Sequence, residues 1–291
     1  MKIIAPVNNK GGVGKTKITT ILAEYFSTIL GKSVLGIDFD PQCNFSQLFL
    51  KMDLDPASPQ GVMPPIHPEH DPNDTEFDDD GRSSIANIFF GRPFVPYPTR
   101  LKNFELAPGH ADKLLQAEAV RRADVAEKVH KQLTLLLESP ELQEAYDIIL
   151  IDTAPSKGPL TVSVFKAATH ILIPTVMEEQ PIQGVYGMMQ LWMQEATSRP
   201  KSKPLHLLGI LPNMFDKQTS LHRNMLESLM ESSAISKYIM PTKLGDRIVF
   251  AEVDTTSNSS QSIFDLPDSN PAKIEALKFC EYVTNKVFQD E

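Results

Sequence analysis

Cysteine and long apolar runs are scarce in this chain, and each scarcity excludes a class of protein. Cysteine occurs only twice, at Cys43 and Cys280, so we expect no disulfide framework and a reducing, cytoplasmic location. No apolar run approaches the ~18 residues that a membrane-spanning helix requires. The chain enters its first apolar segment at once, so we also expect no signal peptide. Hydrophobic residues make up 41% of the chain, which is enough for a buried core.

Positive charge is also in short supply. The 28 lysines and arginines face 37 aspartates and glutamates, which gives a formal net charge of −9. Such a balance argues against nucleic acid as a partner. The excess is local, however, because seven acidic residues lie between positions 69 and 80 and the rest of the chain carries only −2. A basic face elsewhere on the protein is therefore permitted.

A glycine-rich loop at residues 9–16 is the most informative feature that is present. It follows an apolar run at residues 3–7 and precedes an apolar-periodic segment at residues 18–30. Strand, glycine loop and helix is the setting of a P-loop, in which backbone N–H groups and the helix dipole hold phosphate oxygens. We expect Lys15 to reach the β- and γ-phosphates and Thr16 to bind Mg²⁺. Asn9 stands where the usual loop has glycine, and asparagine tolerates a left-handed backbone.

Further apolar runs of strand length follow, separated by helix-like stretches: residues 34–37, 148–151, 171–174 and 205–211. Because these runs are continuous rather than alternating, apart from His206, they indicate strands buried on both faces. The order predicts a doubly wound, mostly parallel twisted sheet with helices on both faces, an α/β fold. Weaker strand candidates lie at residues 104–108 and 237–240. Helices are expected at residues 83–89, 117–139 and 272–288.

We expect a single domain over residues 1–291, interrupted by an acidic, proline-rich insertion at about 53–99. This insertion is predicted to be mobile or irregular. It is interpreted either as a solvated surface loop or as a docking site for a partner.

Carboxylates follow two of the predicted strands. Asp38 and Asp40 end the run that starts at Val34, and Asp152 ends the run at residues 148–151. Ligands of open α/β sheets bind at the carboxyl ends of strands, so these groups suit a magnesium nucleotide site. Asp152 fits the Walker B role of holding Mg²⁺. Of the first two carboxylates, one would serve the metal and the other would hold the attacking water.

These motifs resemble those of the ParA/MinD family of dimerising ATPases, whose deviant P-loop carries an extra lysine, here Lys10. Residues 38–42 match the family's Asp-x-Asp-Pro-Gln, in the form of the ParA branch, and residues 151–155 match its Walker B segment. The resemblance implies a P-loop ATPase that uses ATP and Mg²⁺, with no helix-turn-helix before the loop. It assigns catalytic roles to Lys10, Lys15 and Asp40 and metal binding to Thr16, Asp38 and Asp152. The implied nucleotide contacts are Lys10, Gly11, Gly12, Val13, Gly14, Lys15, Thr16, Lys17 and, on the adenine side, Pro212 and Asn213.

The resemblance also implies a cellular role in partition or positioning. ATP would clamp a homodimer in which Lys10 reaches the partner's nucleotide, and the dimer would bind DNA non-specifically on the nucleoid. A ParB-like or adaptor protein would stimulate ATP hydrolysis and release the dimer, segregating plasmid or chromosome DNA or another cargo. The expected DNA contacts are Lys217, Arg223, Lys243 and Arg247.

Three alternatives compete with this interpretation. A membrane-associated MinD-like ATPase would need a C-terminal amphipathic helix, but this chain ends in Asp290 and Glu291, which suit an acidic bilayer poorly. A biosynthetic ATP-dependent ligase on the same fold would need substrate-binding residues near the γ-phosphate, and the sequence offers no such set. A metal-cluster carrier would need paired cysteines, which are absent.

Overall fold

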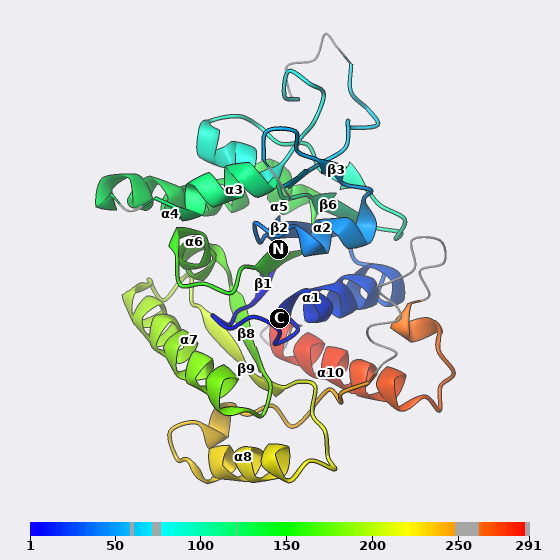
Figure 1. Ribbon diagram of the computed structural model, residues 1–291, viewed down its shortest axis with the longest axis vertical. Coiled ribbons are helices and arrows are strands. Elements are labelled where there is room, and N and C mark those ends of the chain that lie inside the picture. Colours follow the sequence, from blue (N-terminus) through cyan, green and yellow to red (C-terminus); the bar gives the residue numbers. More distant parts are fainter. Residues whose placement is uncertain (59–60, 72–76, 121, 248–261, 289–291) are drawn as a thin grey trace. The chain divides into compact units, whose positions relative to one another are not determined.

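The computed structural model describes residues 1–58, 61–71, 77–120, 122–247 and 262–288 (Figure 1). The chain divides into two compact units, the first made of Met1–Ala5 and Phe26–Ala168 and the second of Pro6–Tyr25 and Thr169–Glu291. The strands form a seven-stranded sheet in the order β5-β6-β2-β7-β1-β8-β9. Within this sheet, all described pairings are parallel except that of β5 with β6. The prediction of a doubly wound, mostly parallel sheet is therefore confirmed, whereas the extent of a single domain stays a prediction.

In the first unit the sheet is built on two fully buried strands, β2 (Val34–Phe39) and β7 (Ile148–Thr153). They run in parallel with Val34 opposite Ile148 and Phe39 opposite Thr153. β1 (Lys2–Pro6) pairs with the other edge of β7, and β6 (Phe104–Ala107) pairs with β2. Continuous apolar sequence fits this position because both faces of each central strand are covered.

The helices of the first unit differ from prediction at one place. They are α2 (Asn44–Phe49), α3 (Ala111–Glu118), α4 (Ala123–Leu137), α5 (Pro140–Ala145) and α6 (Pro159–Ala167). The single helix expected at residues 117–139 is wrong, because α3 ends at Glu118 and α4 begins at Ala123. Ala117 and Val129 are both buried, yet at 3.6 residues per turn one continuous helix would place them about 120° apart around its axis. Breaking the helix lets both apolar stripes face the interior.

The acidic insertion contains regular structure in the part that the model describes. β3 (Asp53–Leu54) and β4 (Val62–Met63) form a small antiparallel sheet, and β5 (Tyr97–Pro98) pairs with β6. A 3₁₀ helix at Ile85–Phe90 corresponds to the expected short helix. The Tyr97 hydroxyl accepts the Ser83 N–H at 3.0 Å and donates to the Pro65 carbonyl at 2.8 Å. The segment is thus irregular only in part, since it has a small buried centre of its own.

The second unit contains the parallel strands β8 (His170–Thr175) and β9 (His206–Pro212). Its helices are α1 (Lys15–Glu24), α7 (Glu179–Ser198), α8 (Ser220–Glu231) and α10 (Pro271–Phe288). A π-helical turn at Tyr25–Ile29 follows α1 along the chain, and from Phe26 on its residues belong to the first unit. α1 and α10 lie side by side (Figure 1), and α10 confirms the helix predicted at residues 272–288. No helix of the described residues has both the length and the apolar character needed to cross a bilayer.

The strand expected at residues 237–240 is wrong. The segment begins as a 3₁₀ turn, Ser236–Tyr238, in which the Tyr238 N–H donates to the Ile235 carbonyl at 2.8 Å. Only a single bridge joins Ile239 to Ile210. Backbone groups that close a local turn cannot also extend a strand ladder, so four apolar-rich residues were too weak a signal here.

Candidate functional site

The P-loop, which belongs to the second unit, has the backbone that its glycines predict. Gly12 and Gly14 have φ angles of +73° and +83°, in the left-handed region. A Cβ at Gly14 would overlap the side-chain amide of Asn213, so this position excludes every larger residue. A left-handed Asn9 is not observed, because the described non-glycine residues with positive φ are Cys43, Asn103 and Met214. The turn instead takes its left-handed residues from the glycines.

Two lysines border the loop. Lys15 is only 6% exposed and opens α1, and its ammonium donates to the Lys10 carbonyl at 3.3 Å. Thr16 and Lys17 follow in the same first turn, which contains no acidic side chain. The positive end of the α1 dipole therefore keeps its attraction for an anion.

Asn8 was missed by the sequence analysis. Its amide donates to the Pro174 carbonyl at 2.9 Å, and its Oδ1 accepts the Lys10 N–H at 3.0 Å. It thus fastens the start of the loop to the end of β8. Its place directly before the loop was the available signal.

Asn213 holds the other side of the loop. It follows Pro212, the last residue of β9, and its amide donates to the Val13 carbonyl at 2.8 Å. Its backbone N–H donates to the Thr175 carbonyl at 2.9 Å. Asn213 is only 5% exposed. One of its two amide hydrogens is used in the bond to the P-loop. Contact of Pro212 and Asn213 with adenine stays a prediction.

The carboxylates belong to the first unit, where Asp38 and Asp152 lie opposite each other on β2 and β7. Both are fully buried. Asp38 accepts three hydrogen bonds, from the Ser46 hydroxyl at 2.6 Å, the Ser46 N–H at 2.8 Å and the Asp40 N–H at 3.1 Å. Burial raises the pKa of Asp38 to about 7, against the lowering effect of these donors. By accepting the Ser46 N–H, Asp38 caps the N-terminus of α2, although it precedes Ser46 by eight residues in the sequence.

Asp40 lies in the turn that follows β2 and is 7% exposed. Its Oδ1 accepts the Gln42 N–H at 2.9 Å, and its carbonyl accepts the Cys43 N–H at 2.8 Å. Cys43 has a φ of +53° and is fully buried. Burial, aided by the Asp38 and Asp40 carboxylates, raises the pKa of its thiol, so Cys43 acts as a small buried apolar residue and not as a thiolate.

Helix α3 contacts three parts of the first unit. Just before it, the Gly109 N–H donates to the Ser46 hydroxyl at 3.0 Å. In its middle, the Lys113 ammonium donates to Asp78 of the insertion at 2.6 Å. At its end, the Glu118 carboxylate accepts the Ser156 hydroxyl at 2.6 Å and caps α6. None of these contacts was visible in the sequence, because each joins positions far apart in the chain.

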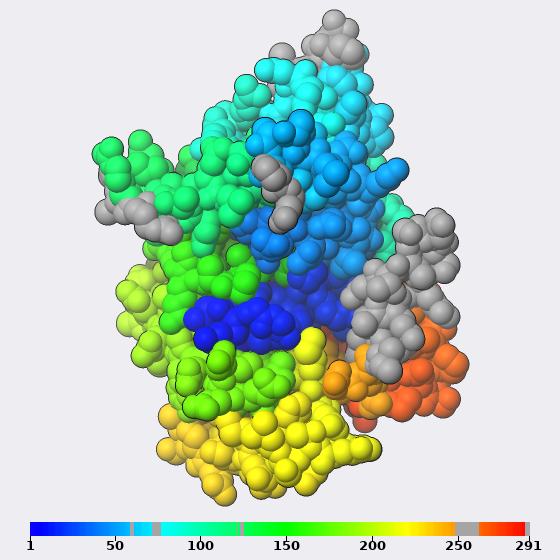
Figure 2. All heavy atoms as spheres, viewed as in Figure 1, coloured from blue at the N-terminus to red at the C-terminus, as the bar shows by residue number. Residues whose placement is uncertain are grey.

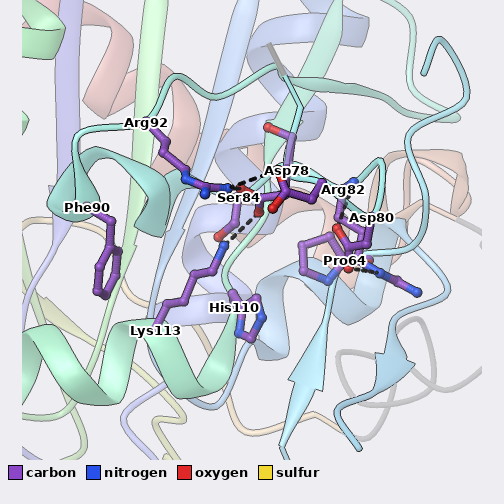
Figure 3. Close-up of a pocket in the computed structure, with 11 residues that line it drawn as sticks. Pro64, Asp78, Asp80, Arg82, Ser84, Phe90, Arg92, His110 and Lys113 are labelled. Atoms are coloured by element: carbon purple, nitrogen blue, oxygen red, sulfur yellow. Dashed lines mark hydrogen bonds and ion pairs between the residues drawn. The ribbon is translucent and has the colours of Figure 1, made fainter. Parts of the chain in front are cut away.

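A pocket of about 440 Å³ lies where the insertion meets α3 (Figure 3). Asp78 is at its centre and accepts from Lys113 at 2.6 Å and from Arg92 at 3.2 Å. Arg82 pairs with Asp53 at 2.6 Å and with Asp80 at 3.0 Å. The charges that line the pocket are largely satisfied by one another, and they hold the insertion to α3.

The four cations expected to contact DNA lie in the second unit. Arg223 of α8 donates to the Lys217 carbonyl at 2.7 Å, and the Lys243 ammonium lies 4.3 Å from the centre of the Phe215 ring. Arg247 forms an ion pair with Glu275 at 2.6 Å, which raises its pKa. Figure 2 shows the segment around α8, in yellow, at the surface. Arg247 is thus partly neutralised, and DNA contact stays a prediction for all four.

Metal binding is compatible with the chemistry of these side chains. Asp38, Asp152 and the Thr16 hydroxyl supply hard oxygen ligands, which Mg²⁺ prefers while keeping several waters and substrate phosphates. Among the described residues, no three His, Cys, Asp or Glu side chains gather as a preformed metal cluster. The oxygen chemistry of each side chain fits Mg²⁺, and a shared role of Asp38, Asp152 and Thr16 in metal binding stays a prediction.

The parallel sheet, the glycine loop before α1 and the buried carboxylates near the carboxyl ends of β2 and β7 define a P-loop nucleotide-binding protein. A family model described as an AAA domain matches residues 1–203. The chain belongs to this family, and within it to the ParA/MinD-type P-loop ATPases, as the motifs predicted.

The relatives agree with this assignment. The chain is 29% identical over 218 residues to the chromosome-partitioning ATPase Soj of Thermus thermophilus, covering 75% of this chain and 71% of Soj. It is 24% identical over 295 residues to the virulence plasmid ParA family protein pGP5-D of Chlamydia psittaci, covering 100% and 97% of the two chains. The fold is similar to that of an ATP complex of Cyanothece McdA, with a TM-score of 0.74 at 16% identity and coverage of 98% and 96%.

Proposed function

We propose that this ATPase hydrolyses ATP with Mg²⁺ to position a cargo, as partition proteins of the ParA type do. The observation that carries the proposal is the P-loop with its second lysine, Lys10, followed by the Asp-x-Asp-Pro-Gln sequence at residues 38–42. The Soj and pGP5-D relatives support a role in partition. Solved structures of similar fold include complexes with ATP and with ADP and magnesium.

In the proposed reaction, the P-loop amides and Lys15 bind the phosphates. The N-terminus of α1, whose first turn contains no acidic side chain, adds attraction for their negative charge. Thr16, Asp38 and Asp152 would hold Mg²⁺, which neutralises the charge that develops on the phosphoryl group. Asp40 orients the attacking water, since phosphoryl transfer depends more on positioning than on early proton removal. Slow turnover without a partner follows if the partner completes the site.

In the proposed cycle, ATP closes a homodimer in which each Lys10 reaches the nucleotide of the other subunit. The dimer binds DNA non-specifically through Lys217, Arg223, Lys243 and Arg247 and is then nucleoid-associated within the cytoplasm. A ParB-like or adaptor protein stimulates hydrolysis and releases the subunits. The γ-phosphate acts as the switch between the two states.

The membrane alternative is disfavoured by the contacts of α10. The apolar stripe of this helix, which includes Phe279, Val283 and Val287, is buried within the second unit. Tyr282 also donates to the Leu208 carbonyl at 3.3 Å. Because this apolar face packs against the protein interior, it is not exposed for insertion into lipid.

The biosynthetic alternative has a structural parallel but less support. A cobyrinic acid a,c-diamide synthase from Mycobacterium smegmatis has a similar fold, with a TM-score of 0.62 at 21% identity. The curated relatives that match most of the chain include partition proteins. Product analysis with candidate acids, ammonia or glutamine and ATP would reveal a ligase or amidase activity.

Retention on DNA-coated beads, measured with ATP, with ADP and without nucleotide, tests the proposal. We expect binding only with ATP, and the Lys15→Ala variant should lose both ATP binding and retention. Equal retention in all three conditions would refute an ATP-gated DNA switch. Unchanged affinity of Lys15→Ala for ATP would remove the assignment of the phosphate site.

A further inference from the structure

Ser46 has a defined hydrogen-bonding direction in the first turn of α2. It is fully buried, and its hydroxyl lies 2.6 Å from Asp38 Oδ2 and 3.0 Å from the Gly109 nitrogen. Because the Gly109 N–H can only donate, the Ser46 oxygen accepts that bond. The single hydroxyl hydrogen of Ser46 is then directed at the Asp38 carboxylate.

The same carboxylate continues the connection to Asp40. Asp38 Oδ1 accepts the Asp40 N–H at 3.1 Å. Asp38 Oδ2 accepts both the Ser46 hydroxyl, at 2.6 Å, and the Ser46 N–H, at 2.8 Å. The result is an unbroken series of hydrogen bonds from Gly109 through Ser46 and Asp38 to the backbone of Asp40. All four residues belong to the first unit.

Close packing supports the same connection. A Cβ at Gly109 would lie 2.8 Å from the Cys43 sulfur and 3.3 Å from the Asp38 carbonyl oxygen. Gly109 therefore packs closely against Asp38 and Cys43, the two residues that bound the segment containing Asp40. A displacement of Gly109 would be transmitted to that segment, because a packed interior does not deform freely.

Two further hydrogen bonds of Asp40 are local. Its carboxylate accepts the Gln42 N–H, and its carbonyl accepts the Cys43 N–H. Both donors lie in the same short turn, so they shape the turn without fixing it to the rest of the unit. One long-range attachment of this turn runs through Asp38 and Ser46 to Gly109.

We propose that Ser46 is a positioning residue for the water-orienting Asp40. This inference rests on the proposed function, in which Asp40 holds the attacking water. The Ser46 hydroxyl fixes the Asp38 carboxylate, and Asp38 fixes the backbone of Asp40. Loss of the hydroxyl leaves the Gly109 N–H and Asp38 Oδ2 each short of a partner in a buried site, and the Asp40 turn relaxes. A shift on the order of 1 Å in such a group can lower turnover about 100-fold.

The test separates turnover from nucleotide binding. Ser46→Ala should lower kcat about 10- to 100-fold while the dissociation constant for ATP, measured by calorimetry, changes less than threefold. Ser46→Thr, which keeps the hydroxyl, should restore most of kcat. Ser46→Cys keeps the volume with a weaker donor and should give an intermediate kcat. It also provides the comparison if the alanine variant does not fold.

Ser163→Ala is the matched control. Ser163 is also fully buried, and its hydroxyl donates to the Leu160 carbonyl at 2.6 Å, a bond that stays within α6. Its kcat should stay within twofold of wild type, although its melting temperature falls as in Ser46→Ala. An equal loss of kcat in both variants would reduce the Ser46 effect to general destabilisation and overturn the proposal.

Asp40→Ala distinguishes failure of this inference from failure of the proposed function. If Asp40→Ala loses turnover but folded Ser46→Ala or Ser46→Cys retains wild-type kcat, the role of Ser46 is refuted and that of Asp40 stands. If Asp40→Ala itself turns over ATP at the wild-type rate, Asp40 does not hold the water and the inference fails with it.

Discussion

Replacement of Asn213 by alanine should weaken the P-loop itself, independently of the base of the nucleotide. The Asn213 amide donates to the Val13 carbonyl at 2.8 Å, and both residues are at least 95% buried. Loss of one partner from a buried hydrogen bond costs about 1–3 kcal/mol. Since 1.4 kcal/mol corresponds to a factor of ten, the affinity of the loop for phosphates should fall roughly 5- to 150-fold.

Calorimetric titration of Asn213→Ala with ATP and with GTP distinguishes two roles for this residue. If Asn213 only holds the loop, both affinities should fall by the same factor, and the melting temperature without nucleotide should fall as well. If Asn213 hydrogen-bonds the adenine edge, as the family resemblance implied, the affinity for ATP should fall more than that for GTP. Unchanged stability together with unchanged affinity for both nucleotides would refute the loop-holding argument.

Trp192→Phe is a suitable control for this experiment. The Trp192 indole N–H donates to the Leu205 carbonyl at 3.1 Å in the same unit, so the variant loses a comparable bond away from the P-loop. It should lower the melting temperature without changing the affinity for either nucleotide. A drop in nucleotide affinity here would show that the assay reports global stability.

Three further variants test other features. Cys43→Gly should be more stable to urea than Cys43→Ala by about 1 kcal/mol, because Cys43 has a φ of +53° and only glycine adopts it without strain; a more stable alanine variant would contradict this. The pKa of Asp38 is raised from 3.8 to about 7 by burial, so its contribution to stability is complete below about pH 4 and is lost as the pH rises through 7. Asp38→Asn should therefore flatten the decline of unfolding free energy between these values, measured by denaturant titration without magnesium, and an unchanged slope would show that another group titrates. Lys10→Ala should bind ATP yet stay monomeric in light scattering, whereas an ATP-dependent dimer would exclude the contact across the interface.

The central strands and the P-loop could be predicted from sequence because their signals are local. Val34–Phe39 and Ile148–Thr153 are buried along their whole length, as their continuous apolar sequence indicated. The parallel pairing that places Asp38 opposite Asp152 follows from strands separated by helices. Gly14 directly precedes α1. A glycine loop between a strand and a helix is the setting typical of a P-loop, so this local pattern was enough to predict it.

The errors and the missed contacts occurred where the packing of the chain decides the outcome. The helix expected at residues 117–139 breaks because its two apolar stripes do not share one face, a conflict that amphipathicity alone did not reveal. The bond between Ser46 and Gly109 joins positions 63 residues apart. Asn8 and Asn213 contact the loop through the Lys10 N–H and the Val13 carbonyl, and no pattern of residue types marks such backbone partners. The hydrogen bonds of these side chains were found only when the backbone placed their partners beside them.

The insertion is anchored to the helix that also supports the site. Lys113 meets Asp78 at 2.6 Å in a position where only a quarter of its side chain is exposed. The same helix ends in Glu118, which caps α6. Excision of the insertion would therefore remove the Asp78 carboxylate that pairs with the Lys113 ammonium. It would also remove one of the attachments that hold α3 in place. Engineers who shorten this protein, or who exchange the segment for that of a relative, should treat Asp78 and Lys113 as one transplantable unit.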